Sequence, residues 1–178
     1  MVNFDIKETL SGRDYKAPAL ANYILEHHLE NELVDYALAQ SNEIEWRGIW
    51  IVDHCSEIDE KRIKPFHERL IKNLKKEKLH GSVIRCTLRI FQTQVIPKRQ
   101  ESFLLDKCYT YLKNPYWPIA IRSSSITVIF NISKRYPELI EELKVCLLHL
   151  MPSEADAAIT SRIRSTLKEI EKLQPKSK

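Results

Sequence analysis

The spacing of apolar residues is that of α-helices along almost the whole chain. In residues 17–28, Leu20, Tyr23, Ile24 and His27 fall at positions i, i+3, i+4 and i+7, on one face of a helix. Breaks between such segments coincide with proline, asparagine and serine, which end or begin helices. The pattern indicates about nine helices and no credible pair of strands, and therefore predicts an all-α protein. The predicted helices are 17–28, 33–40, 44–55, one beginning near Pro65, 81–95, 103–112, 119–135, 137–150 and 154–173.

Four of these segments begin alike, with a small or apolar stretch that leads into an arginine. The arginines are 38, 37 and 40 residues apart, and Cys108 and Cys146 in the second helices are 38 apart. A period of this length predicts stacked helix pairs, because one pair cannot bury its own apolar face. The four segments are Ile44-Glu45-Trp46-Arg47, Ser82-Val83-Ile84-Arg85, Ile119-Ala120-Ile121-Arg122 and Ile159-Thr160-Ser161-Arg162.

Helix–turn–helix units at this spacing resemble HEAT-like repeats over residues 41–173, and the whole chain resembles small bacterial HEAT/ARM-type proteins of unassigned activity. The resemblance implies a right-handed α-α superhelix, a solenoid with a concave surface, and a role in binding. We expect a single solenoid domain over 1–173 and a frayed tail over 174–178. Its expected parts are an N-terminal helical pair at 17–40 and repeat units at about 43–78, 79–114, 115–152 and 153–173.

Glycine is scarce, and this limits the chemistry that the chain can carry. The three glycines among 178 residues are Gly12, Gly48 and Gly81, so no glycine-rich loop is present to cradle a phosphate. Walker A and Rossmann fingerprints are therefore excluded. The six histidines form no ligand spacing typical of metal sites, and we expect no metal, no cofactor and no enzymatic activity.

The net charge of +4 hides an uneven distribution. Residues 1–60 carry 4 basic and 13 acidic side chains, whereas residues 61–178 carry 24 basic and 11 acidic ones. The stretch 61–113 alone has 14 basic and 4 acidic residues. Such a division bears on the choice of partner and on long-range attraction rather than on fold.

The four cysteines include no CxxC pair, and the composition is not that of a disulfide-rich secreted protein. The first residues lack the pattern of a signal peptide, and no stretch is long and apolar enough for a transmembrane helix. We therefore expect a cytoplasmic protein with reduced, buried thiols and no membrane contact.

The repeated arginines Arg47, Arg85, Arg122 and Arg162 are the first candidate binding residues. Equivalent positions in stacked repeats lie along one ridge, where guanidinium groups could bind phosphates or carboxylates in pairs. The alternative is structural, because HEAT-like repeats use an arginine here to bridge neighbouring repeats. Both interpretations stay open on the sequence.

A run of lysines provides the second set of candidates. Lys72, Lys75 and Lys76 belong to a basic stretch within 61–78 whose spacing places most of it on one helix face. A solvated outer face is the ordinary explanation, and binding to a phosphate backbone is the alternative.

These observations favour a non-enzymatic binding or scaffold module that presents a concave or edge surface to a protein partner. The alternative is nucleic-acid binding through the basic segment 61–135. A special case is a DNA glycosylase, since some are built from HEAT-like repeats, but Asp53 with Trp46 and Trp50 does not match their motif. The sequence does not identify the partner, the oligomeric state or the biological process.

Overall fold

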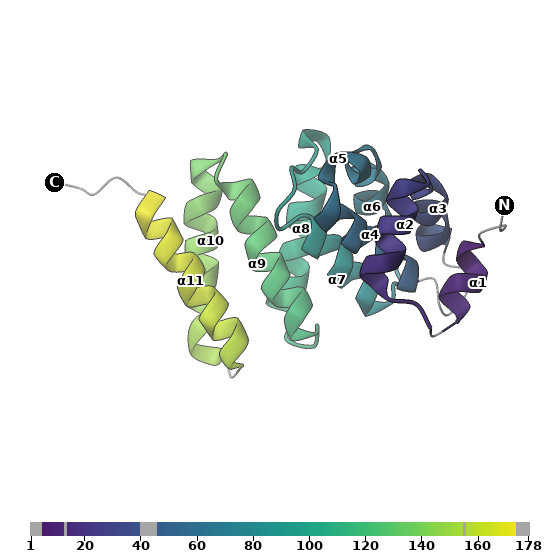
Figure 1. The fold of residues 1–178 in the computed structure, drawn as a ribbon. Coiled ribbons are helices and arrows are strands. Elements are labelled where there is room, and N and C mark those ends of the chain that lie inside the picture. Colours follow the sequence, from purple (N-terminus) through teal and green to yellow (C-terminus); the bar gives the residue numbers. More distant parts are fainter. Residues whose placement is uncertain (1–4, 13, 40–45, 155, 174–178) are drawn as a thin grey trace. The chain divides into compact units, whose positions relative to one another are not determined.

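The computed structural model describes residues 5–12, 14–39, 46–154 and 156–173, and over these it contains helices and turns but no strand (Figure 1). The predicted all-α fold is confirmed. The chain divides into two compact units, Met1–Pro97 and Lys98–Lys178, while the single domain over 1–173 stays a prediction. Two expected features lie outside the described residues: the first residues of the helix predicted from Ile44, and the frayed tail.

The first unit is organised around its central helix. That helix, α4, packs against α2, α3 and α7, and its residues Ile49, Ile51 and Val52 are fully buried. The helices are α1 (Ile6–Ser11), α2 (Ala17–Glu26), α3 (Glu30–Ala39), α4 (Trp46–Ile58), α5 (Glu60–Ile63), α6 (His67–Asn73) and α7 (Gly81–Ile90), with a 3₁₀ turn at Lys64–Phe66.

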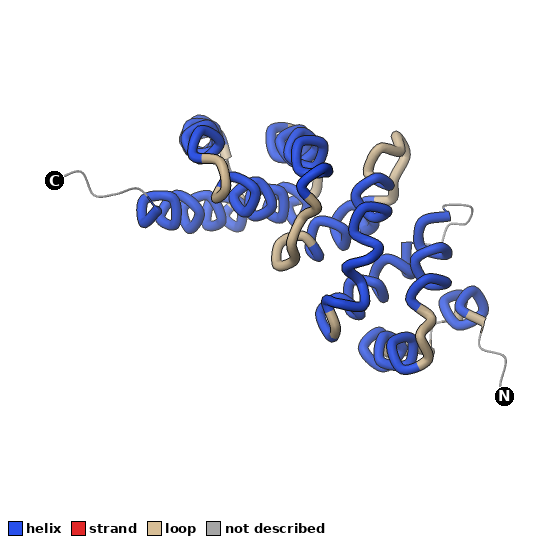
Figure 2. The backbone as a smooth tube through the Cα atoms, turned by 90° about the horizontal axis from the view of Figure 1, so that it is seen from above, coloured by secondary structure: helices blue, strands red, loops and turns tan. Residues whose placement is uncertain are grey.

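The second unit consists of four longer helices. They are α8 (Glu101–Lys113), α9 (Ile119–Ser133), α10 (Pro137–Leu150) and α11 (Ala157–Leu173), with 3₁₀ turns at Lys98–Gln100 and Met151–Ser153. Helix α9 packs against the other three, and 10 of its 15 residues are buried. In Figure 2, α9 and α11 form one layer of this unit, and α8 and α10 form the other.

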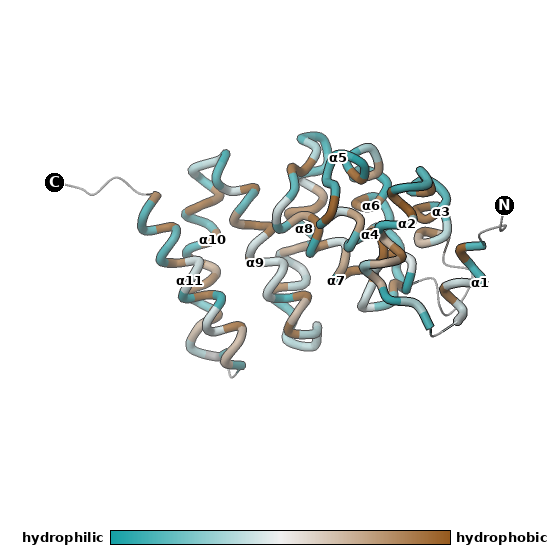
Figure 3. The backbone as a smooth tube through the Cα atoms, in the orientation of Figure 1, coloured by the Kyte–Doolittle hydropathy of each residue, from teal (hydrophilic) through white to brown (hydrophobic). Residues whose placement is uncertain are grey.

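Amphipathic spacing is clear in α11. Ile159, Ile163 and Ile170 are fully buried on one face, and the alternation with polar residues is visible along the helix in Figure 3. The predicted start at residue 154 is too early, because the Asp156 carboxylate accepts hydrogen bonds from the backbone N–H groups of Ala158 at 2.8 Å and Ile159 at 3.1 Å. Asp156 thereby caps the helix and fixes its first turn.

Helix α1 is absent from the sequence prediction, although a capping pattern marks it. The Asp5 carboxylate accepts hydrogen bonds from the backbone N–H groups of Lys7 at 2.7 Å and Glu8 at 3.1 Å. An acidic N-cap followed by Glu three residues later is typical of a helix start. The helix has only 6 residues, too few for apolar periodicity to show.

Two predicted boundaries are wrong because side-chain contacts within the fold override the local pattern. The helix expected from Pro65 is preceded by α5 and starts after a 3₁₀ turn that contains the proline. Helix α7 ends at Ile90 rather than near residue 95, since Gln94 turns inward. Its amide donates to the Ser56 carbonyl at 3.0 Å, and its Oε1 lies 2.6 Å from His67 Nε2.

Arginine–carboxylate pairs connect successive helix pairs within each unit. In every one the two residues are 32–36 positions apart, which is one repeat. The pairs in the first unit join arginines after residue 60 to acidic residues before it, so part of the uneven charge is neutralised inside the fold. The pairs are Arg62–Glu30, Arg69–Asp35, Arg89–Asp53 and Arg89–Glu57 in the first unit, and Arg122–Glu154 and Arg135–Glu101 in the second.

The closest helix contact in the first unit depends on Gly48. A Cβ atom at this position of α4 would lie 3.0 Å from the Cβ of Ala37 and 3.1 Å from its Cα, and 3.0 Å from Cδ1 of Tyr36. Because one of these atoms belongs to the backbone of α3, the two helices would have to separate to admit a methyl group. Glycine is therefore required here for close packing.

We expect Gly48→Ala to lower the free energy of unfolding by about 1–2 kcal/mol, because overpacking outweighs the roughly 1 kcal/mol that alanine adds to helix propensity. Denaturant unfolding followed by circular dichroism measures this. Gly12→Ala is the control, since φ at Gly12 is −65° and an added Cβ would meet no atom closer than 3.4 Å. Equal stability of wild type and Gly48→Ala would contradict the packing argument.

Candidate functional site

Two hollows lie between α8 and α10 in the second unit, one toward each end of these helices, and the strip of surface that carries both is called the furrow below. The N-terminal hollow has a volume of about 320 Å³. One wall comes from α8 and the turn before it, the other from α10, and residues at the end of α9 and after it complete the lining. The lining residues are Lys98, Glu101, Ser102, Leu105, Ile132, Tyr136, Glu138 and Leu139.

The C-terminal hollow has a volume of about 490 Å³ and lies between the last residue of α8 and the second half of α10. Apolar side chains make up much of its lining, and Val145 is 66% exposed. The lining residues are Lys113, Glu142, Val145, Cys146, His149 and Leu150.

The two helices run in the same direction along the furrow. The first hollow is lined by the N-terminal parts of α8 and α10, and the second by their C-terminal parts. Between the hollows, Leu105, Tyr109 and Lys113 follow one another at a spacing of four and share one face of α8. The furrow is thus bounded by two parallel helices over about 16 Å, the rise of the 11 residues from Ser102 to Lys113.

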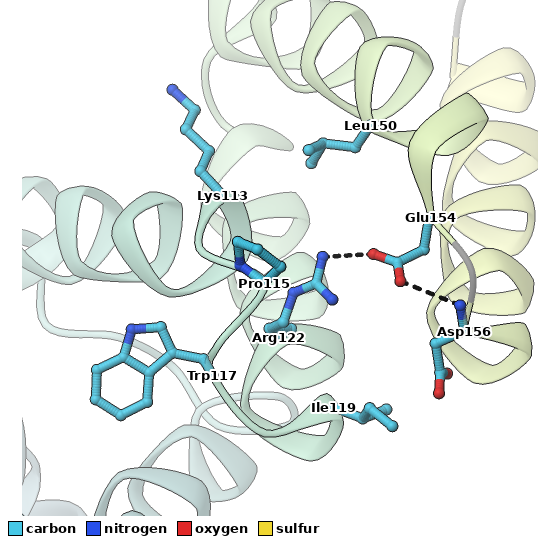
Figure 4. Close-up of a pocket in the computed structure, with 8 residues that line it drawn as sticks. All are labelled: Lys113, Pro115, Trp117, Ile119, Arg122, Leu150, Glu154 and Asp156. Carbon is cyan, nitrogen blue, oxygen red and sulfur yellow. Dashed lines mark hydrogen bonds and ion pairs between the residues drawn. The ribbon is translucent and has the colours of Figure 1, made fainter.

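A third hollow of about 660 Å³ adjoins the C-terminal end of the furrow and shares Lys113 and Leu150 with it (Figure 4). At its centre, Arg122 and Glu154 point toward one another, with Nη2 of the arginine 2.5 Å from Oε2 of the carboxylate. Arg122 also donates from Nε to the Leu112 carbonyl at 3.3 Å. Arg122 and Glu154 are both largely buried and satisfied within the protein, so this pair offers no free charge to a ligand.

Among the described residues, each hollow of the furrow has one lysine and one glutamate that have no ion-pair partner. Lys98 and Glu138 line the N-terminal hollow, and Lys113 and Glu142 line the C-terminal one. Within the described part of the chain, none of these four has an ion-pair partner within 4.0 Å. Glu101 differs, because it pairs with Arg135 at 2.7 Å and accepts a hydrogen bond from the Tyr136 hydroxyl at 2.8 Å.

Tyr109 lies on α8 near Glu142 and Cys146, two residues that line the C-terminal hollow. It is only 9% exposed, and its hydroxyl has no hydrogen-bond partner among the described residues. Burial raises the pKa of the phenol, and the nearby Glu142 and Cys146 raise it further. The Lys113 ammonium lies 5.1 Å from the centre of the ring. The Tyr109 hydroxyl is thus buried in its neutral form, and Lys113 provides the cation at the apolar lining of the hollow.

The repeated arginines have different surroundings. Arg47 donates to the carbonyls of Leu10 at 2.7 Å and Gly12 at 3.4 Å, at the end of α1, and Arg122 is the buried residue of the ion pair above. Arg85 is exposed on α7, and Arg162 is exposed with its Nε 3.4 Å from the Ser123 hydroxyl. Two of the four thus bond to the carbonyls at the end of a neighbouring helix. Ligand binding by this set stays a prediction.

The predicted lysines lie on α6 and the turn that follows, and all three are exposed. Lys72 is 3.9 Å from the Glu68 carboxylate, and the Lys76 ammonium donates to the Leu38 carbonyl at 2.7 Å. Lys76 is therefore engaged near the end of α3, and phosphate binding by the lysines stays a prediction.

Asp53, the residue considered for glycosylase chemistry, is buried and paired. It is 1% exposed and lies 2.7 Å from Nε of Arg89. Burial raises the pKa of Asp53 to about 7, although Arg89 lowers it. The neighbouring Cys86 is buried as well, and burial together with Asp53 raises the pKa of its thiol to about 12, as expected for an inert core cysteine.

The described residues contain no group of three or more histidine, cysteine, aspartate or glutamate side chains placed to hold a metal ion. Among the same residues, no helix combines the length and apolar character needed to cross a membrane.

Comparison with protein families defines the class to which this fold belongs. The model of the HEAT repeat domain matches residues 7–170, so the chain belongs to the HEAT repeat family. HEAT repeats generally mediate protein binding, and the family is generally non-catalytic. No curated protein and no solved structure matches the chain at a significant level.

The sequence prediction included none of the furrow residues, although a pattern in α10 marks them. Ile140, Leu143 and Leu147 form the buried stripe of this helix, and Val145 and Leu148 fall outside it. Apolar residues on a second face of a helix indicate a second surface to be covered. The walls of the furrow, by contrast, come from helices about 40 residues apart and require the fold to be known.

We expect Arg122→Ala to lower the free energy of unfolding by about 3–5 kcal/mol, because it leaves the Glu154 carboxylate buried without its partner. Arg162→Ala, at the equivalent but exposed position, is the matched control and should cost less than about 1 kcal/mol. Chemical unfolding of both variants measures the difference. Similar losses in the two would show that burial does not distinguish these arginines.

The raised pKa of Asp53 predicts a pH dependence of stability. Its folded value of about 7 lies above the roughly 3.9 of an unfolded chain, so the folded state binds the proton more tightly. The stabilisation from this group is complete below about pH 4 and is lost as the pH rises through 7. We expect Asp53→Asn to remove this decline in unfolding free energy, and Asp35→Asn, in an exposed pair, to retain it. An unchanged decline in Asp53→Asn would contradict the raised pKa.

Proposed function

We propose that this protein is a non-enzymatic binding module that holds a segment of a protein partner in the furrow between α8 and α10. The observation that carries the proposal is the apolar surface left open along one side of α10. Val145 is exposed there in a hollow that Leu150 also lines, and Leu105 and Leu139 line the other hollow. Exposed apolar patches rimmed by polar residues are typical of protein interaction sites.

The surroundings of the cations favour a protein partner over a nucleic acid. Binding to a phosphate backbone depends on several arginines and lysines free to contact successive phosphates. Arg47, Arg122 and Lys76 are instead bonded to carbonyls or carboxylates of the protein itself. An apolar furrow with few charges suits burial of side chains rather than of phosphates.

We expect Val145→Lys to abolish partner capture from cells that express the protein, since a lysine places a charge where an apolar side chain must be buried. Leu173→Lys, at a 53% exposed position at the end of α11, is the control and should retain the partner. Quantitative mass spectrometry of the captured proteins measures both, and circular dichroism checks that both variants fold.

A partner retained equally by Val145→Lys and Leu173→Lys would place binding elsewhere on the protein. Retention on DNA or RNA that falls steeply with salt and is unaffected by Val145→Lys would favour the nucleic-acid alternative instead.

A further inference from the structure

We propose that the furrow between α8 and α10 binds an amphipathic α-helix that carries acidic residues along one flank and basic residues along the other. The inference rests on the proposed function and specifies the chemistry of the segment that is bound. It follows from the walls of the furrow, from the positions of its charges and from the spacing of its hollows.

The walls favour a helix over an extended segment. Backbone N–H and C=O groups within α8 and α10 are bonded along each helix, so the furrow offers no strand edge with which an extended segment could pair. Apart from the lysines and glutamates, few polar side chains line the hollows that could replace such an edge, chiefly Ser102 and His149. An extended segment would lose the hydration of its backbone without compensation, whereas a helix satisfies its own.

The charges define the two flanks of the bound helix. The cations Lys98 and Lys113 come from the side of α8, and the anions Glu138 and Glu142 from α10. Each hollow has one of each, and none has an ion-pair partner within 4.0 Å among the described residues. A helix with acidic residues facing α8 and basic residues facing α10 would neutralise all four.

The positions of the two hollows define where the bound helix has its row of apolar side chains, called its ridge, and how long the helix is. They lie near the two ends of the roughly 16 Å between Ser102 and Lys113, which corresponds to about three turns of a helix. Apolar side chains at positions i, i+4, i+7 and i+11 of the segment would reach Leu105 and Leu139 at one end and Val145 and Leu150 at the other. A segment of about 14 residues is therefore sufficient.

A display library tests both the site and its chemistry. Its members are 14-residue helical peptides with apolar residues at the four ridge positions and either Glu or Lys at every flank position. Selection on the full chain, followed by counter-screening on Val145→Lys, isolates peptides that use the furrow. We expect these peptides to have Glu on one flank and Lys on the other.

Affinity of single peptides gives the quantitative test. A peptide with segregated flanks should bind about 10-fold more tightly than an isomer of the same composition whose flanks each mix Glu and Lys, and high salt should reduce the difference. Fluorescence anisotropy measures both. In the variant Lys98→Glu/Lys113→Glu the preference should disappear, because both walls are then acidic. Lys168→Glu, on the exposed face of α11, is the control and should retain it.

The two proposals fail in different ways. Peptides that need Val145 but show no flank preference would overturn the inference and leave the proposed function standing. If the selection yields no peptide that binds the wild-type chain but not Val145→Lys, both the proposed function and the inference are overturned. If the chain self-associates and Val145→Lys abolishes this self-association, the occupant of the furrow is a second copy of the chain. That result would also overturn the inference.

Discussion

The burial of α9 on almost every side is the constraint on which the second unit depends. Ten of its 15 residues are buried, and they include Arg122 and three serines as well as the apolar side chains, so α8, α10 and α11 together cover most of the helix. Helices α8 and α10 both pack on α9, so they face each other across the surface of α9. The furrow is therefore a direct result of covering one apolar helix with two others.

Many charged side chains of this chain form ion pairs between neighbouring repeats and so are not available to a partner. Arginines from residue 62 onward pair with carboxylates one repeat away, in both units. Exposed pairs such as Arg69–Asp35 contribute little stability, whereas the buried Arg122–Glu154 pair is costly to break. The basic excess of the sequence is thus a poor measure of the charge available for binding. The charged side chains of the furrow that have no ion-pair partner among the described residues are few, and their positions are ordered.

Periodicity alone was sufficient for the class of fold and for most helices of the second unit. Helix α10 begins at Pro137 and ends at Leu150 as predicted, because a proline start and a following break mark both ends. The boundaries of α7 and α6 were less accurate, since Gln94 and Pro65 take positions set by their contacts in the fold.

The repeated arginines show the same limit at the level of side chains. Their spacing correctly located equivalent helices, yet Arg122 is buried and Arg162 is exposed. The site was less predictable than the fold, because its walls come together only when α8 and α10 are placed side by side.

The regular spacing of the ion pairs also bears on how the chain folds. Each of the six arginine–carboxylate pairs among the described residues joins residues 32–36 positions apart, and the helices that they connect are near neighbours in sequence. Each such pair closes a loop of similar length, and none of them requires the two ends of the chain to meet, so the entropic cost of loop closure is similar for every repeat. Either unit can therefore nucleate on its own and add helices to a formed neighbour, so that assembly proceeds one repeat at a time.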